Sequence, residues 1–396
     1  MDELRLDVNF VDYAILAIYF VAVLGIGFAA KRFIKTSLDY FLSGRSLPAW
    51  ITGLAFISAN LGALEILGMA ANGAQFGLYT LHYYWIGAIP AMVFLGLVMM
   101  PFYYGSQVRS VPEYLRLRFN KPTHVFNAMT FAIATVLIAG VDLYALALVL
   151  KLLLPVADPA RHRRRRRDRA GLHHARRPRL GDLQRGAAVL HHPGRADPAH
   201  DRRPCRPRAS GRRRRTPLIG AYPKIFIPAV TIIPGLLALV LIPDLGSDKL
   251  NMEYNNAIPL LINEFLPNGM LGLALVGLIV AFMAGVAANV SAFNTVVTYD
   301  LWEPYVRQGR DDDYYLRFGR IATVGGILIG ILTALIASGY TNIMDYIQLL
   351  FSFFNAPLFA TFIIGMFWRR MTPWAGFWGL VAGTAPPGPT TRTRAA

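Results

Sequence analysis

Long apolar runs, each long enough to cross a lipid bilayer, recur along this chain and constrain its fold more than any other feature. A helix needs about 20 predominantly apolar residues to span roughly 30 Å of hydrocarbon. Helices of this kind are predicted at about 10–31, 48–72, 78–104, 124–151, 216–242, 270–298, 317–339 and 343–368, with a ninth beginning near 373. Apolar residues make up 55% of the chain, above the ~45–50% usual for soluble domains. The sequence therefore predicts an all-α polytopic membrane protein.

One stretch, residues 155–215, does not fit this pattern. It holds 20 of the 40 Lys and Arg residues, 6 of the 8 His residues and the only cysteine, Cys205, and it contains no Phe, Tyr, Trp, Ile, Met, Lys or Glu. Arg, Ala, Gly, Pro and His are the residues that GC-rich DNA encodes when it is read out of frame. We interpret the stretch as an out-of-frame-like, disordered segment. The alternative is a genuine arginine-rich loop that binds nucleic acid or acidic lipid.

Almost all of the formal net charge of +17 lies in this stretch, and the rest of the chain is nearly neutral. The charge is therefore no sign of a nucleic-acid partner, and none is expected. One cysteine excludes a disulfide framework and fits no metal spacing. The first residues, MDELRLDVNF, are acidic, and the apolar run after them is too long for a signal peptide.

The basic residues of the short loops predict how the chain crosses the membrane. The loops at 32–47, 105–123 and 301–320 each carry three or four Lys or Arg residues, whereas 243–269 carries four acidic residues against one Lys. Because Lys and Arg favour the cytoplasmic side, the first three loops are predicted inside and the fourth outside. The N-terminus is then outside, in a plasma (inner) membrane.

This orientation leaves a gap in the count of crossings. The helix predicted at 124–151 must end outside, and the helix at 216–242 must start inside, so an odd number of crossings is required within 155–215. Each Arg near the centre of a membrane helix costs about 2.5–3.5 kcal/mol, and no run in that stretch is apolar enough to cross. We therefore divide the chain into an N-terminal transmembrane block at 1–154, the segment 155–215 and a C-terminal transmembrane block at 216–383. The aberrant tail at 384–396 shares the composition of the segment.

Ionisable residues at membrane depth are costly, so they are functional candidates. Glu65 lies among small and polar residues that predict a broken helix, with free carbonyls for a cation and exposed ends for a solute; the alternative is a small-residue helix contact. Lys224, between two prolines, is a solute or carboxylate partner, or else it snorkels to the surface. Asp142 is expected to make a polar contact near the outer half of its helix, or to pair with a group on a lost helix.

Two further patterns are less specific. The run at 284–300 is small and polar, so it either lines a pathway or allows close helix packing. Gln348 suits sugar hydroxyls, although a single Gln in a membrane helix is more often a contact between helices. The sequence has no Walker loop, no GxSxG and no hydrolytic carboxylate pair, so an enzyme is not expected.

Five motifs, in order, resemble the sodium:solute symporter family, which includes the sodium/glucose and sodium/galactose cotransporters. They are DYFLSGRSLPAW at 39–50, SANLGALEILGMAANGAQFG at 58–77, SVPEYLRLRFN at 110–120, NTVVTYDLWEPY at 294–305 and YIQLLFSFFNAPLFATFIIGMFWRR at 346–370. The resemblance covers 1–154 and 216–383. It implies a leucine-transporter-like core of two inverted five-helix repeats, with one extra helix before it. About three core helices would be missing here, and the C-terminus would be truncated.

The resemblance also implies a sodium site. The ion would be held by backbone carbonyls of Ser58 and Leu61 and, across the bundle, of Ala281. In sugar-transporting relatives two adjacent hydroxyl residues complete the site, and the matching positions here are Ala284 and Gly285. This departure removes two oxygen ligands of a hard cation, so proton-coupled or uncoupled transport is an alternative.

For the solute, the resemblance implies Asn60, Glu65, Tyr84, Lys224 and Gln348. Two of these depart from the family pattern, because Glu65 is an amide in the galactose relative and Tyr84 replaces a sugar-binding carboxylate. The implied function is sodium-coupled uptake of a small polar, sugar-like solute by alternating access. An organic acid or another solute is the alternative, and this copy is expected to be inactive. A membrane sensor with a basic loop and an ion channel are the rival classes.

Overall fold

The computed structural model of the chain describes residues 8–30, 53–54, 57–58, 60–100, 111–153, 218–219, 221–242, 245–246, 253–267 and 269–385. Within these ranges the regular structure is entirely helical. The longest helices are α1 (Phe10–Ala30), α8 (Lys121–Leu153), α11 (Ile227–Leu241), α13 (Met270–Thr295) and α15 (Asp312–Ala337). The predicted all-α fold class is confirmed.

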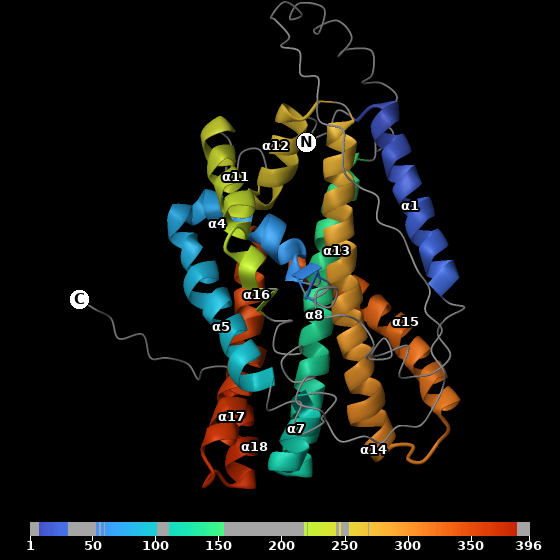
Figure 1. Cartoon of the computed structure of the whole chain (residues 1–396), viewed down its shortest axis with the longest axis vertical. Coiled ribbons are helices and arrows are strands. Elements are labelled where there is room, and N and C mark those ends of the chain that lie inside the picture. The colour runs from blue at the N-terminus through green and yellow to red at the C-terminus, as the bar shows by residue number, and fades with distance from the viewer. Residues whose placement is uncertain are drawn as a thin grey trace, which may run out of the picture.

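The shorter helices complete the bundle (Figure 1). They are α4 (Met69–Phe76), α5 (Ile89–Phe94), α7 (Val111–Arg118), α12 (Ala257–Phe265), α14 (Glu303–Tyr305), α16 (Ile343–Leu350), α17 (Ala356–Phe367) and α18 (Pro373–Thr384). Wide π-helical turns join several of them, at Leu64–Gly68, Tyr83–Ala88, Leu95–Met99, Val296–Trp302 and Phe351–Asn355.

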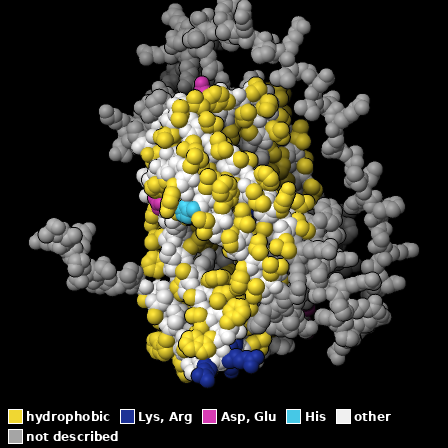
Figure 2. Space-filling view, turned by 60° about the vertical axis from the view of Figure 1, so that its left-hand side comes forward, with side chains coloured by type: hydrophobic (Ala, Val, Ile, Leu, Met, Phe, Trp, Pro, Cys, Tyr) yellow, Lys and Arg dark blue, Asp and Glu magenta, His cyan; other side chains and the backbone are white. Residues whose placement is uncertain are grey.

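The outer surface of the bundle is apolar, as a lipid-facing surface must be. Six of the described helices are long and apolar enough to cross a membrane, or seven if the bent pair Leu64–Leu81 and Tyr83–Met99 forms one span. Large apolar side chains such as Phe28 and Leu335 are more than two-thirds exposed. In the face drawn in Figure 2, apolar side chains cover the length of the molecule, and Lys and Arg side chains gather at one end.

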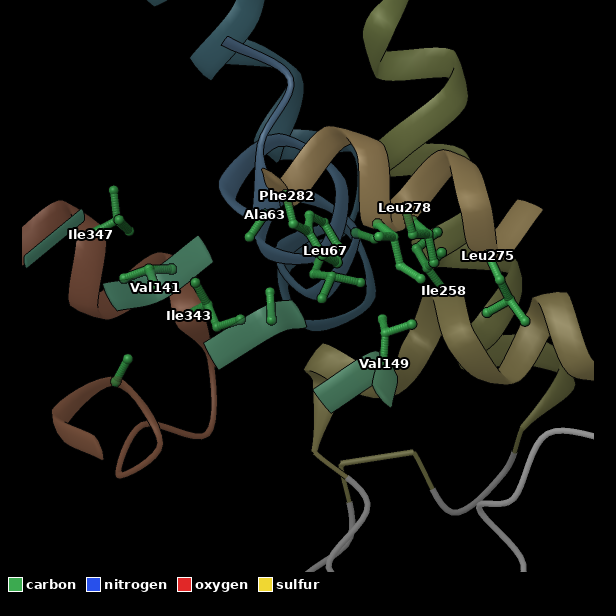
Figure 3. Packing of buried hydrophobic residues seen from close by; sticks show 14 of the residues in the cluster. Ala63, Leu67, Val141, Val149, Ile258, Leu275, Leu278, Phe282, Ile343 and Ile347 are labelled. Atoms are coloured by element: carbon green, nitrogen blue, oxygen red, sulfur yellow. The ribbon is translucent and has the colours of Figure 1, made fainter. Parts of the chain in front are cut away.

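Helix α8 lies at the centre of the bundle and packs along both α13 and α15. Its core contacts include Val141 and Val149, which lie in one buried cluster with Leu275 and Phe282 of α13 (Figure 3). Small residues allow close approach. A Cβ at Gly140 would lie 2.3 Å from the Thr333 hydroxyl of α15, so the two helices are nearly in backbone contact.

Helices α8 and α11, which are consecutive among the long described helices, run toward the same side of the bundle. Near the end of α8, Tyr144 donates a hydrogen bond to Glu253 at 3.3 Å. Near the end of α11, Ala238 is buried against Tyr254 and Ala257. Two consecutive helices in this orientation require an odd number of crossings between them, as the loop charges also do. The segment 155–215, and with it the prediction that it does not cross the membrane, lies outside the described residues.

Polar side chains join the N-terminal block to the C-terminal block at both ends of the bundle. At one end, the buried carboxylate of Asp12 accepts backbone N–H groups of Gly269 and Gly272, both at 2.7 Å, and so satisfies the start of α13. At the other end, Arg118 donates to the carbonyl oxygens of Gly365 at 2.9 Å and Trp368 at 3.0 Å, at the end of α17. Both contacts place a charge where the helix dipole favours it.

Most predicted boundaries agree with the structure to within a few residues, but three loops contain helices that were not predicted. The loop at 105–123 contains α7, and the loop at 243–269 contains a short 3₁₀ turn followed by α12. The loop at 301–320 contains α14 and the first turns of α15. These helices are too short or too polar to be recognised as membrane-spanning runs.

We predict that Gly235→Ala destabilises the protein, because a Cβ at this position of α11 would lie 2.0 Å from the carbonyl oxygen of Ala70. Overpacking of this kind costs about 1–3 kcal/mol, and thermal unfolding of the purified protein in detergent should show a lower midpoint. Gly25→Ala in α1 is the matched control, since a Cβ added there would have no atom within 4 Å. Equal midpoints for the two variants would contradict the close approach of α4 and α11.

Candidate functional site

The site is built around a break in the helix at 57–76. The N–H of Leu61 donates to the carbonyl oxygens of Ile57 at 3.0 Å and Ser58 at 3.2 Å, and the chain bends at 61–62 before a π-helical turn begins at Leu64. After Phe76 the helix ends at Gly77, whose φ of 73° favours glycine. Small residues on both sides of the bend allow the irregular backbone, so the predicted broken helix is present.

Three of the predicted solute residues meet in one buried cluster. The Nζ of Lys224 lies 2.8 Å from one carboxylate oxygen of Glu65, and the hydroxyl of Tyr84 donates a hydrogen bond to the other. All three side chains are buried, with exposed fractions of 4%, 8% and 2% respectively. The Lys224 ammonium also lies 5.9 Å from the centre of the Tyr84 ring, within range of a cation–π interaction.

This cluster joins three separate parts of the chain. Glu65 lies on the π-helical turn before α4, Tyr84 on the π-helical turn Tyr83–Ala88, and Lys224 on the short helix that precedes α11. The turn at 225–226, between Pro223 and Pro228, separates Lys224 from α11 itself. Lys224 is therefore held inside the bundle and does not snorkel.

The remaining solute candidates lie close by. Gln348 of α16 accepts a hydrogen bond from the hydroxyl of Tyr83 at 3.0 Å, and Tyr83 adjoins Tyr84 in the chain. Asn60 is half-buried at the bend of the broken helix. Leu61 packs against the buried cluster that contains Tyr84, which brings the bend and the solute candidates together. The sequence pattern did not single out Tyr83, whose only signal was its place beside Tyr84.

The two parts of the chain that carry the predicted cation positions meet at one buried carboxylate, that of Asp142, beside Ala63 and Gly285. Its Oδ1 accepts the N–H of Ala63 at 2.9 Å, and its Oδ2 accepts from the side chain of Asn289 at 3.3 Å. A Cβ at Gly285 would lie 2.5 Å from Oδ2. Ala281 packs against the core cluster that contains Ala63, and Ala284 is half-buried on the same helix, α13.

Asp142 makes polar contacts in the second half of α8, as expected from the sequence. The side chain is only 4% exposed and reaches the backbone of the broken helix. Asn289, from the small and polar run at 284–300, is one of its partners. That run therefore provides both a polar side chain and, at Gly285, the space that the carboxylate fills.

A separate cavity of about 980 Å³ opens at the end of the bundle where α8 begins. It is lined by both basic and acidic residues, among them Arg116, Lys121 and Glu303. His124 lies 3.3 Å from Asp300 at its wall and 2.8 Å from the Tyr305 hydroxyl. None of the predicted solute or cation residues lines this cavity, so it is distinct from the site around Glu65.

Comparison with known proteins gives consistent results. The sequence model of the sodium:solute symporter family matches residues 40–157 and 216–383. The sodium/glucose cotransporter of Vibrio parahaemolyticus is 24% identical, and the alignment covers 96% of this chain and 85% of that protein. The human sodium/myo-inositol cotransporter 2 is 23% identical, over 94% of this chain and 68% of the relative. The Vibrio alignment has 466 positions, more than the 396 residues of this chain, so the relative has segments without a counterpart here.

Among solved structures, a Na⁺-coupled sialic acid symporter in a substrate-bound outward-open state is similar, with a TM-score of 0.69. The match covers 95% of each chain at 15% identity, so it concerns the fold, which is leucine-transporter-like. The apolar helices and the family match together define a multi-pass membrane protein of a solute-transporting family. The chain belongs to the sodium:solute symporter family, whose model covers well over half of it. Members of this family are transporters rather than enzymes, and sodium is the coupling ion of the family.

We predict that breaking the buried pair destabilises the protein more than removing the pair. Lys224→Met leaves the Glu65 carboxylate buried without its cation, which should cost about 3–5 kcal/mol of unfolding free energy. The double variant Glu65→Gln/Lys224→Met should recover most of the loss, as thermal unfolding in detergent would show. The control is Asp313→Asn, which removes an ion pair with Arg317 whose side chains are 65% and 75% exposed and should change little. Additive losses in the double variant would contradict the pairing.

Proposed function

We propose that this site binds a neutral polyhydroxy solute, sugar-like or cyclitol-like, and corresponds to the solute site of a family of carriers that work by sodium-coupled alternating access. The observation that carries the proposal is the cluster of Glu65, Tyr84 and Lys224, which has carboxylate, hydroxyl and ammonium groups within one buried volume. Gln348 adds an amide group beside it, through its hydrogen bond with Tyr83. Alternating donors and acceptors of this kind suit a ring of hydroxyl groups.

The charge of the cluster favours a neutral solute over an organic acid. Lys224 is compensated by Glu65 at 2.8 Å, so the cluster presents no net positive charge to a carboxylate. An anionic solute would have to take Lys224 from Glu65 and leave a second buried negative charge unpaired. The family pattern places a carboxylate at 84 and an amide at 65, and here the carboxylate is at 65 instead. Lys224 therefore still has one carboxylate as its ion-pair partner.

The named relatives support this solute class. Two of them are described as cotransporters of glucose and of myo-inositol, both uncharged polyhydroxy compounds.

For the orientation of the chain, we propose a plasma (inner) membrane with the N-terminus outside. The basic residues of α7 and of the loops after α14 and α17 support this orientation, because they lie at the end of the bundle opposite the start of α1.

We further propose that the chain with this sequence binds solute but does not transport it. The family model matches the residues on either side of 158–215 and skips that stretch. The parallel run of α8 and α11 requires crossings that an arginine-rich sequence does not favour. Repeats that rock against each other need all of their helices, whereas a binding cluster needs only the residues that form it.

A binding experiment tests the solute class. Full-length protein in lipid nanodiscs should bind radiolabelled glucose or myo-inositol in sodium buffer, with weak or no binding of sialic acid. Glu65→Gln removes the charge that compensates Lys224. The affinity for neutral polyhydroxy solutes should therefore fall roughly tenfold, the value of a charged hydrogen bond, and the affinity for sialic acid should rise. Asp345→Asn, at an exposed position of α16, is the control. Preference of the unmodified protein for the acid would contradict the proposal.

An uptake experiment tests the second part. Proteoliposomes that contain the full chain should show no solute uptake above empty liposomes under an inward sodium gradient. The Vibrio sodium/glucose cotransporter, reconstituted in parallel, provides the positive control. Saturable, sodium-dependent uptake by the unmodified chain would show that the proposed inactivity is wrong.

A further inference from the structure

The carboxylate of Asp142 is buried at membrane depth without a basic partner among the described residues. Its side chain is 4% exposed, and the described Lys, Arg and His side chains include none within ion-pair distance. Two hydrogen bonds, from the Ala63 N–H and the Asn289 amide, orient it but bring no positive charge. A buried carboxylate in a medium of low dielectric constant is strongly destabilised unless a cation compensates it or a proton neutralises it.

The position of this carboxylate relates it to the cation. Its Oδ1 bonds to the backbone two residues after Leu61, and its Oδ2 lies against Gly285 on α13. Leu61 and Gly285 come from the two parts of the chain between which the family's sodium ion is expected. Asp142 therefore connects both walls of that site from a third helix, α8.

Two glycines provide the space for the carboxylate. A Cβ at Gly62 would lie 2.6 Å from Oδ1, and a Cβ at Gly285 would lie 2.5 Å from Oδ2, so any larger residue at either position would displace Asp142. The same glycine at 285, together with Ala284, removes the side-chain oxygens that sugar-transporting relatives have there. The small residue at 285, which removes a hydroxyl ligand, therefore also makes room for the Asp142 carboxylate.

We propose that Asp142 is an anionic ligand of the coupling sodium ion and takes the place of the hydroxyl ligands absent at 284 and 285. Carboxylate and carbonyl oxygens are the ligands that hard cations prefer. The ion compensates the buried charge, and the carboxylate strengthens a site that otherwise consists of backbone carbonyls. The inference rests on the proposed function only in that sodium is the coupled ion, and it is independent of the solute.

The first test measures sodium alone. Full-length protein in detergent should bind ²²Na⁺ and should unfold at a higher temperature in sodium than in N-methylglucamine buffer. Asp142→Asn keeps an oxygen for the Ala63 N–H but loses the charge, so sodium affinity should fall at least about tenfold, as the loss of a metal-site partner usually does. Asp345→Asn, an exposed carboxylate with the same substitution, should keep the sodium response.

The thermal data separate a ligand from a merely structural residue. Because Asn removes an uncompensated charge, Asp142→Asn should be at least as stable as the unmodified protein in sodium-free buffer and less stable than it in sodium. An equal loss of stability in both buffers would overturn the proposal, and so would an unchanged sodium affinity.

A second variant covers the case in which Asp142→Asn does not fold. Gly285→Ala leaves Asp142 in place chemically but forces its carboxylate to move, so sodium affinity should again fall by about tenfold. Gly277→Ala on the same helix is the control, since nothing would lie within 4 Å of its added Cβ. If both glycine variants bind sodium as the unmodified protein does, the proposal is wrong. No solute is present in these experiments, so a failed solute proposal leaves their outcome unchanged.

Discussion

Lipid supplies no hydrogen bonds, so every polar group at membrane depth must find its partner inside the protein. Two groups of described residues illustrate this constraint. Glu65 is served by Lys224 and Tyr84, and Asp12 is served by the first N–H groups of α13. Most of the remaining buried volume is filled by apolar side chains such as those of Figure 3. Glu65 and Tyr84 lie on irregular turns, whereas Asp142 lies within the regular helix α8.

The site depends on the irregular backbone of the broken helix. A continuous helix satisfies its own N–H and carbonyl groups and presents only side chains. The bend at 61–62 and the π-helical turn after it release backbone groups, one of which, the Ala63 N–H, bonds to Asp142. Bent and widened turns also place Glu65 and Tyr84 toward the same interior volume. The small residues that weaken this helix are thus what make it a binding element.

The sequence predicted the all-α class, the membrane-spanning runs and the break near Glu65, because each depends on local composition. It did not predict α7, α12 or α14, which are too short or too polar to be recognised. The meeting of Glu65, Tyr84 and Lys224 was expected only through the family resemblance, since residues 19 and 159 positions apart give no local signal. The polar contact of Asp142 was expected, but its partners Ala63 and Asn289 were not, because they lie on two other elements.

The contacts that join the two blocks have a consequence for assembly. Arg118 with the end of α17, Asp12 with the start of α13, and Lys224 with Glu65 all link residues of 8–153 to residues of 221–385. Helix α8 adds a long apolar interface with α13 and α15. Each block therefore presents apolar and polar surfaces that match those of the other block. In this respect the molecule resembles a heterodimer whose subunits happen to share one polypeptide.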